Sequence, residues 1–318
     1  MGGDTSALSR FALRASSFVD WVPVFRSYLI GALVLLSACA RPDVRRPAGA
    51  GARDDFGSVV DVRTVPHRIV SLNPTTTELL FAIGASKRIV GRSQWDVFPD
   101  AARSVPSLGQ ALRPNVEAII GAHPDLVLLY ASTDNRPAFD RLRRAGVAVF
   151  AFKIDSIEQF ARDTRLIGRM TGDSASAATL VDSVEATLAR VRDATASLPH
   201  PTVFMHAWDK PIFAIGGGSF LTELLTIAGA RNVYSDITAP SATVTLEDVV
   251  LRDPDIVLAA PIAVEKMRAD AAWRTVPAVR AGGRRLLAYD TLLVGRPSAT
   301  LGAAAVSLAA LLHPGIVR

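Results

Sequence analysis

The chain has 318 residues, of which 49% are hydrophobic and 20% are charged, so it is long enough for two folded lobes and too apolar for a disordered protein. Its 35 basic and 30 acidic side chains give a formal net charge of +5, and no Lys/Arg run is long enough to follow a phosphate backbone. A nucleic-acid partner is therefore not expected.

The N-terminus has the pattern of an export signal. A continuous apolar or small run from Leu29 to Ala38 is shorter than the roughly 20 residues that a membrane-spanning helix needs, but it fits the hydrophobic region of a signal peptide. It ends in Leu36-Ser37-Ala38-Cys39, which resembles a bacterial lipobox, where the cysteine is acylated and becomes the new N-terminus. We predict a lipoprotein signal peptide over residues 1–38 and lipidation of Cys39.

The next segment, residues 39–66, is rich in Pro, Gly, Ala and Arg and has no helical or strand periodicity. Such a composition predicts a flexible tether between a lipid and a folded domain. Cys39 is the only cysteine, so a disulfide framework is excluded.

Strands and helices alternate from His67, which predicts an N-terminal lobe over residues 67–154. The expected strands of this lobe are Arg68–Leu72, Arg88–Gly91, Leu126–Tyr130 and Val147–Phe152. The last two lack polar alternation, as in a parallel sheet covered by helices on both faces. Between the first two lies a helix, TTTELLFAIG, for which Thr75 and Glu78 form an expected capping box.

Residues 155–198 are predicted to be a linking helical segment. Asp155 and Glu158 form a second expected capping box, and apolar residues recur at helical spacing after it. A helix from Ser174 to Ser197 would be about 36 Å long and would join two lobes rigidly. A ligand would then lie between the lobes, near the carboxyl ends of the strands.

A comparable series of elements makes up the C-terminal lobe, residues 199–318, and two segments of the first lobe recur in it. NVEAIIGAHPDLVLL, from Asn115, is matched by TLEDVVLRDPDIVLA, from Thr245, and TELL at Thr77 is matched by TELL at Thr222. The order and spacing predict two similar α/β lobes. The expected fold is therefore α/β, with mainly parallel sheets in two lobes joined by a long rigid helix.

These motifs together resemble the extracytoplasmic substrate-binding proteins of vitamin B12 and iron-siderophore ABC importers, the helical-backbone metal receptors with a class III, chelatase-like fold. The resemblance covers about residues 66–314. It implies a lipid-anchored protein of the periplasm or cell surface, expected as a monomer, with a metal chelate and an ABC permease dimer with its ATPase subunits as partners.

In that family each lobe presents a glutamate at a helix start to arginines of the permease, and the matching positions are Glu117 and Glu247. A partner with pseudo-twofold symmetry requires each contact twice. The simpler alternative is that each glutamate only stabilises its own helix N-terminus. Glu78 and Glu223, in the TELL segments, are interpreted as acids at helix starts.

The family lines its ligand site with aromatic side chains from loops after strands. Trp95, Tyr130 and Trp208 occupy such positions, and Phe98 is a further candidate; ordinary packing is the alternative for each. Asp290 and Arg296 match the region that contacts corrin amides, and the arginine would equally suit an anionic siderophore. Ala239-Pro240-Ser241 departs from the vitamin B12 binders, which have an aromatic residue before the second glutamate.

His206 ends a strand beside Trp208 and is either an axial ligand to haem iron or corrin cobalt, or a packed histidine. No His/Asp/Glu set resembles a bare-metal receptor, so no metal site and no cofactor are expected. Gly216-Gly217-Gly218-Ser219 lacks the residues of a phosphate-binding loop, and three glycines that let the chain turn are the preferred explanation.

The sequence thus predicts a binding protein and not an enzyme. It favours a corrinoid slightly over a ferric siderophore, with haem as a further alternative. A lipid-anchored chelate sensor or scavenger without a permease stays open as a different class of function.

Overall fold

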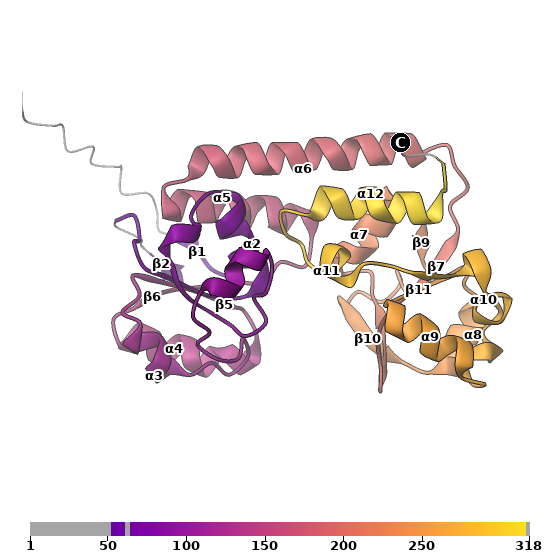
Figure 1. The fold of residues 1–318 in the computed structure, drawn as a ribbon, viewed down its shortest axis with the longest axis horizontal. Coiled ribbons are helices and arrows are strands. Elements are labelled where there is room, and N and C mark those ends of the chain that lie inside the picture. The colour runs from indigo at the N-terminus through magenta and orange to yellow at the C-terminus, as the bar shows by residue number, and fades with distance from the viewer. Residues whose placement is uncertain (1–51, 61–63, 316–318) are drawn as a thin grey trace, which may run out of the picture. The chain divides into compact units, whose positions relative to one another are not determined.

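The computed structural model describes residues 52–60 and 64–315, which contain two α/β lobes and a layer of helices that joins them (Figure 1). Cys39 and the predicted signal peptide lie outside the described residues. None of the helices within the described residues is both long and apolar enough to cross a membrane.

The N-terminal lobe is built on a four-stranded parallel sheet of order β4-β3-β5-β6. Its elements in chain order are β3 (Ile69–Leu72), α2 (Pro74–Ala82), β4 (Ile89–Arg92), α3 (Val116–Gly121), β5 (Leu126–Tyr130), α4 (Arg136–Arg144) and β6 (Ala148–Phe152). All four residues of β3 are buried, as expected for a central parallel strand covered on both faces. The strands predicted from the sequence are confirmed to within a residue.

The sheet of the C-terminal lobe is mixed, with order β10-β8-β7-β11-β12 and β9 on the side of β7. Its strands are β7 (Thr202–Asp209), β8 (Ile212–Ile215), β9 (Arg231–Asn232), β10 (Ser241–Val244), β11 (Ile256–Ala259) and β12 (Leu286–Ala288). Its helices are α7 (Phe220–Ile227), α8 (Leu246–Arg252), α9 (Pro261–Ala269), α10 (Pro277–Ala281) and α11 (Thr291–Val294). The strands β7, β11 and β12 are parallel, whereas β8 and β10 add an antiparallel edge.

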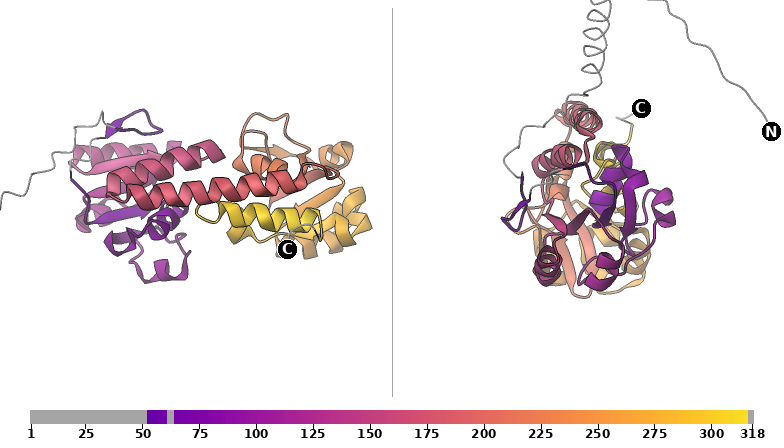
Figure 2. Two further views of the ribbon diagram at one scale, coloured as in Figure 1. Left: turned by 90° about the horizontal axis from the view of Figure 1, so that it is seen from above. Right: turned by 90° about the vertical axis from the view of Figure 1, so that its left-hand side faces the viewer.

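Three helices connect the lobes: α5 (Ile157–Thr171), α6 (Ser174–Thr195) and α12 (Leu301–Leu312). The helix α6 packs on α5 and also on α7 and α12 of the C-terminal lobe, and α12 runs alongside it (Figure 2). Buried residues of α6 belong to one hydrophobic cluster that also contains Leu128 of the N-terminal sheet and Leu258 of the C-terminal sheet. The lobes therefore share a continuous core, and the predicted linking helix is confirmed over Ser174–Thr195.

The repeated helix–strand unit is confirmed as α3–β5 and α8–β11, and its residues have the same local roles in both lobes. The side chains of Asn115 and Thr245 cap the two helices. The aspartates of the two Pro-Asp pairs each accept the backbone N–H that begins the first strand of their own lobe: Asp125 from Arg68 at 2.9 Å and Asp255 from Thr202 at 2.8 Å. Part of the repeat therefore serves the fold itself.

Both predicted capping boxes are wrong. The helix α2 is capped by Asn73, whose side chain accepts from Thr75 N, and Glu78 lies beyond the first turn. The helix α5 has a capping box formed by Ser156 and Gln159, one residue after the predicted pair. In each case a neighbouring polar side chain competes for the same backbone N–H groups, and spacing alone does not decide between them.

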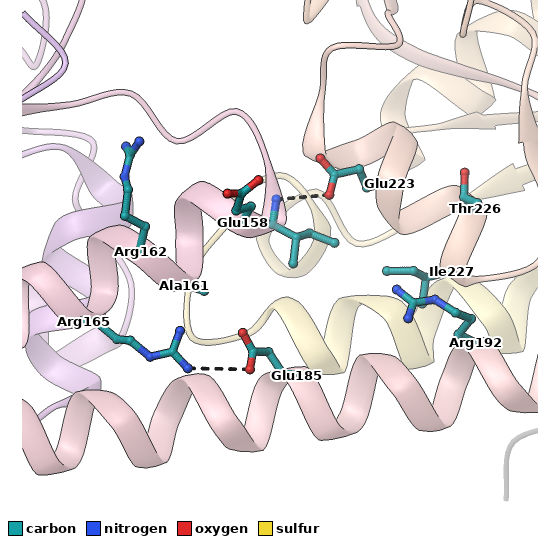
Figure 3. Close-up of a pocket in the computed structure, with 10 residues that line it drawn as sticks. Glu158, Ala161, Arg162, Arg165, Glu185, Arg192, Glu223, Thr226 and Ile227 are labelled. Atoms are coloured by element: carbon teal, nitrogen blue, oxygen red, sulfur yellow. Dashed lines mark hydrogen bonds and ion pairs between the residues drawn. The ribbon is translucent and has the colours of Figure 1, made fainter.

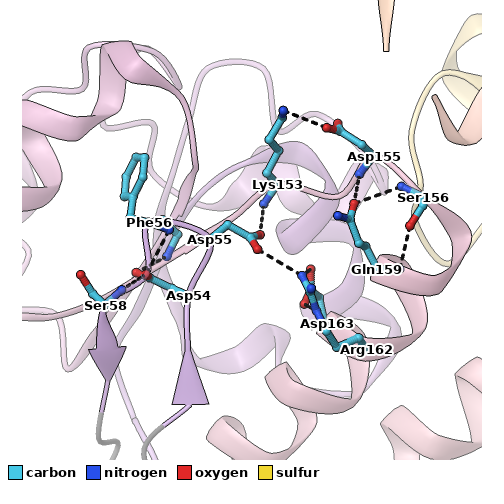
Figure 4. A network of polar contacts seen from close by, with 11 residues as sticks. Asp54, Asp55, Phe56, Ser58, Lys153, Asp155, Ser156, Gln159, Arg162 and Asp163 are labelled. Carbon is cyan, nitrogen blue, oxygen red and sulfur yellow. Dashed lines mark hydrogen bonds and ion pairs between the residues drawn. The ribbon is translucent and has the colours of Figure 1, made fainter. Parts of the chain in front are cut away.

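Residues 52–60 are not a structureless tether, which corrects the prediction for that part of 39–66. They form an antiparallel pair, β1 (Ala52–Arg53) and β2 (Val59–Val60), joined by a turn that the buried Asp54 side chain closes on Ser58 N. Asp55 attaches this turn to the N-terminal lobe, accepting from Lys153 N at 2.6 Å and from Arg162 at 3.2 Å (Figure 4).

Asp163 of α5 belongs to the same network and is 1% exposed. Burial raises the pKa of its carboxyl group to about 6, and the Arg162 guanidinium opposes the rise only in part. Because the folded-state pKa lies above the unfolded value, the contribution of Asp163 to stability is complete below about pH 4 and is lost as the pH rises through about 6.

Asp163→Asn should therefore gain stability relative to the wild type as the pH rises. Between pH 4 and pH 7.5 the difference in free energy of unfolding should change by about 2–3 kcal/mol in favour of the variant. Denaturant unfolding of both proteins across this range measures the difference. Parallel pH profiles would contradict the raised pKa.

Candidate functional site

The loop after β4 presents two aromatic side chains, Trp95 and Phe98, which are 50% and 40% exposed. The carboxylate of Asp96 between them is fully buried and accepts hydrogen bonds from Ser93 Oγ at 2.6 Å and from Thr77 Oγ1 at 2.8 Å. These bonds anchor the loop to α2 while the aromatic rings stay outside the core. Asp96 was not among the predicted site residues, although an acid that follows a strand and lies next to a candidate aromatic residue could have indicated it.

The other two predicted aromatic residues also lie at carboxyl ends of strands. Tyr130 is the last residue of β5 and is half-buried. Trp208, near the end of β7, is 64% exposed and follows an irregularity in the pairing of β7 with β8. Exposed indole rings offer flat apolar faces that a ligand can cover.

His206 is placed differently, because it is only 4% exposed. Its ring packs edge-on against Trp273, with centroids 5.6 Å apart, and Nε2 lies 2.9 Å from Asp209 Oδ1. Burial lowers the pKa of the imidazole, which Asp209 opposes. His206 is therefore placed as a packed histidine. To ligate the metal of a haem or corrin, its side chain would have to leave its contacts with Trp273 and Asp209.

Asp290 and Arg296 lie in the segment after β12. The Asp290 carboxylate caps α11, accepting from Leu292 N at 2.9 Å and Leu293 N at 3.1 Å. Arg296 Nη2 donates to Leu292 O at 3.0 Å, and its guanidinium lies 5.9 Å from the centroid of the Phe98 ring. The segment after β12 in one lobe therefore meets the loop after β4 in the other.

An ion pair between Arg296 and Glu78 of α2 strengthens this contact between the lobes. Arg296 Nε donates to Glu78 Oε1, and the side chains of Arg296 and Glu78 are 18% and 3% exposed. The interpretation of Glu78 as an acid at a helix start is wrong. Burial raises the pKa of Glu78, and Ser298 and Arg296 oppose the rise.

The glutamate of the second TELL segment also reaches out of its own lobe. Glu223, in the first turn of α7, accepts at Oε2 from Ile157 N, the first residue of α5, at 3.2 Å (Figure 3). Both TELL glutamates therefore bind elements on the other side of the junction between the lobes. The recurrence of TELL reflects this paired role, which its local sequence does not reveal.

Glu223 also lines a pocket of about 660 Å³ among α5, α6 and α7. Charged side chains surround it, including Arg165, which pairs with Glu185 at 3.6 Å (Figure 3). None of the predicted ligand residues lines this pocket. It lies on the helical side of the junction and is distinct from the site around Arg296.

The predicted docking glutamates are both exposed and both begin a helix. Glu117 forms an ion pair with Arg141 of α4, whereas Glu247 has no ion-pair partner within residues 52–60 and 64–315. The backbone N–H group of each glutamate is the main cause that lowers the pKa of its carboxyl group. Both side chains are therefore negatively charged at neutral pH.

Neither a metal cluster nor a phosphate loop is found in the described part of the chain. No group of three or more His, Cys, Asp or Glu residues there could hold a metal ion. The chain turns at Gly217 and Gly218, as predicted, with Ser219 N donating to Gly216 O at 3.3 Å. A Cβ on any of the glycines 216–218 would lie 2.1–2.3 Å from a carbonyl oxygen of residues 235–239, so they allow two backbone segments to pack together.

Comparison with known proteins agrees with this architecture. Residues 69–289 match the family described as periplasmic binding protein. A cobalamin-binding protein of Halobacterium salinarum is 32% identical over 245 residues, which are 75% of this chain and 65% of that protein, so the chain spans less than two thirds of that relative.

Two solved structures share the fold. A possible iron-binding periplasmic protein of Staphylococcus epidermidis has a TM-score of 0.68 at 26% identity and covers 79% of this chain and 100% of its own. The periplasmic vitamin B12 binding protein BtuF of Vibrio cholerae has a TM-score of 0.69 at 21% identity and covers 78% and 97%. The family match extends from β3 of the N-terminal lobe through α5 and α6 to the end of β12 in the C-terminal lobe, and the chain therefore belongs to the periplasmic binding protein family.

Proposed function

We propose that this protein is the extracytoplasmic substrate-binding component of an ABC importer, which captures a metal chelate between its lobes and delivers it to a permease. The observation that carries the proposal is the contact of Arg296 with Phe98 and Glu78, because it brings predicted ligand residues of both lobes to one site. Exposed Trp95 and Trp208 supply flat apolar faces of the kind that a large planar ligand covers.

A corrinoid is the favoured ligand, since the relative from Halobacterium salinarum is named a cobalamin-binding protein. A ferric siderophore or haem is the alternative within the same class of function. Lipid attachment through Cys39 and residence in the periplasm or at the cell surface complete the proposal.

The ligand class is tested by native mass spectrometry of the full chain in detergent, offered cyanocobalamin, haemin and a ferric siderophore. One retained adduct is expected. Trp95→Ala and Trp208→Ala should each weaken its binding about tenfold, because each removes an aromatic face. Leu251→Ala is the control, since Leu251 is 82% exposed on α8 and should leave affinity unchanged. Retention of no chelate would refute the proposal.

Delivery to a permease is tested by reversing the charges of Glu117 and Glu247. Glu117→Arg and Glu247→Arg should each reduce ligand uptake by cells at least tenfold and leave the Kd of the purified protein unchanged, because complementary charges mainly orient the encounter. Glu265→Arg provides a matched control, since Glu265 is an exposed glutamate paired with Arg268 in the same lobe as Glu247. Unchanged uptake in both variants would favour a sensor or scavenger without a permease.

A further inference from the structure

The cation that joins the two lobes at the proposed site, Arg296, is already paired. Arg296 donates from Nε to Glu78 and from Nη2 to Leu292 O, so two of its three guanidinium nitrogens are used within the protein. Its Nη1 has no hydrogen bond to any described residue, and 18% of the side chain is exposed. Arg296 can therefore still donate a hydrogen bond to a ligand, while the carboxylate of Glu78 balances its charge.

The carboxylate of Glu78 is shielded from solvent. It is 3% exposed and forms its ion pair with Arg296, while Ser298 also favours its charged form. A carboxylate that has lost its water depends on its positively charged partner to compensate its charge. Glu78 and Arg296 therefore act as a unit with no net charge.

Two further acids lie at the site. Asp290 uses Oδ1 to cap α11 and is exposed, and the buried Asp96 is close enough to raise the pKa of Glu78. The carboxyl groups at the site therefore outnumber the Arg296 guanidinium. An anionic ligand would meet a compensated arginine and an uncompensated carboxylate, whereas a neutral ligand with carbonyl oxygens would meet a hydrogen-bond donor and aromatic faces.

We propose that Glu78 is the specificity-determining residue of this site, because by neutralising Arg296 it makes the site select uncharged chelates with amide groups over anionic chelates. This inference rests on the proposed function. It assigns Glu78 a role that neither its place within a helix nor its TELL motif indicates.

The test compares the affinities of the full chain in detergent for neutral cyanocobalamin and for haemin, which carries two anionic propionates, with Glu78→Gln as the variant. Loss of the carboxylate leaves the charge of Arg296 uncompensated, so the haemin-to-cyanocobalamin affinity ratio should rise at least tenfold. Cyanocobalamin affinity itself should change less than threefold, since the donor at Arg296 Nη1 is retained.

Glu223→Gln is a matched control because it removes the same charge from the same motif in the other lobe, and the glutamine oxygen can still accept from Ile157 N. It should leave the ratio unchanged. If Glu78→Gln fails to fold by circular dichroism, Glu78→Leu, which fills the buried position without a polar atom, should shift the ratio in the same direction.

The outcomes separate this inference from the function on which it rests. A wild type that binds chelate, together with a ratio that stays within twofold in the Glu78 variants, would overturn the role of Glu78 and leave the binding function intact. An equal rise in Glu223→Gln would also overturn it, because the effect would then be one of overall charge. A wild type that binds neither chelate would overturn both.

Discussion

The arrangement of the site depends on the helical layer that both lobes share. Val181, Val184, Leu188 and Val191 of α6 are buried at helical spacing in a cluster that includes residues of both sheets. Close packing extends to backbone contact: a Cβ on Gly168 of α5 would lie 2.4 Å from Ala177 Cβ on α6. A continuous core of this kind transmits strain and resists large rearrangement, so the lobes have little freedom to separate.

This constraint gives the two TELL glutamates their significance. With the lobes joined through α6, the segments after β4 and β12 meet, and Glu78 pairs with Arg296 there, while Glu223 binds the start of α5. Glu78 extends from the N-terminal lobe to the C-terminal lobe, and Glu223 extends from the C-terminal lobe to the start of α5. Such a paired arrangement is expected for halves related by approximate twofold symmetry. One of these contacts adjoins the aromatic residues of the proposed site, which couples the connection between the lobes to the charge that a ligand meets.

The repeats have two different origins. In the Pro-Asp units, Asp125 and Asp255 accept backbone hydrogen bonds at the start of the first sheet strand of their own lobes, and the preceding His123 and Asp253 have positive φ values of 46° and 41°. These features belong to the fold of one lobe. Glu117 and Glu247 are exposed, and under the proposed function their duplication would serve a partner with matching symmetry.

The sequence by itself determined the buried parallel strands, the linking helix and the division into two lobes, because uninterrupted apolar runs and helical periodicity are local signals of burial. It did not reveal β8 and β10, whose exposed or irregular patterns depend on edge pairing, nor the competition between neighbouring polar residues that decided the caps of α2 and α5. The loop position of Trp95 after β4 was predictable, whereas Trp208 lies within the last residues of β7. Tertiary structure alone decided three features of the site. Glu78 pairs with Arg296, and Asp96 anchors the Trp95 loop, because folding brings these partners together. His206 is buried because folding excludes solvent from it.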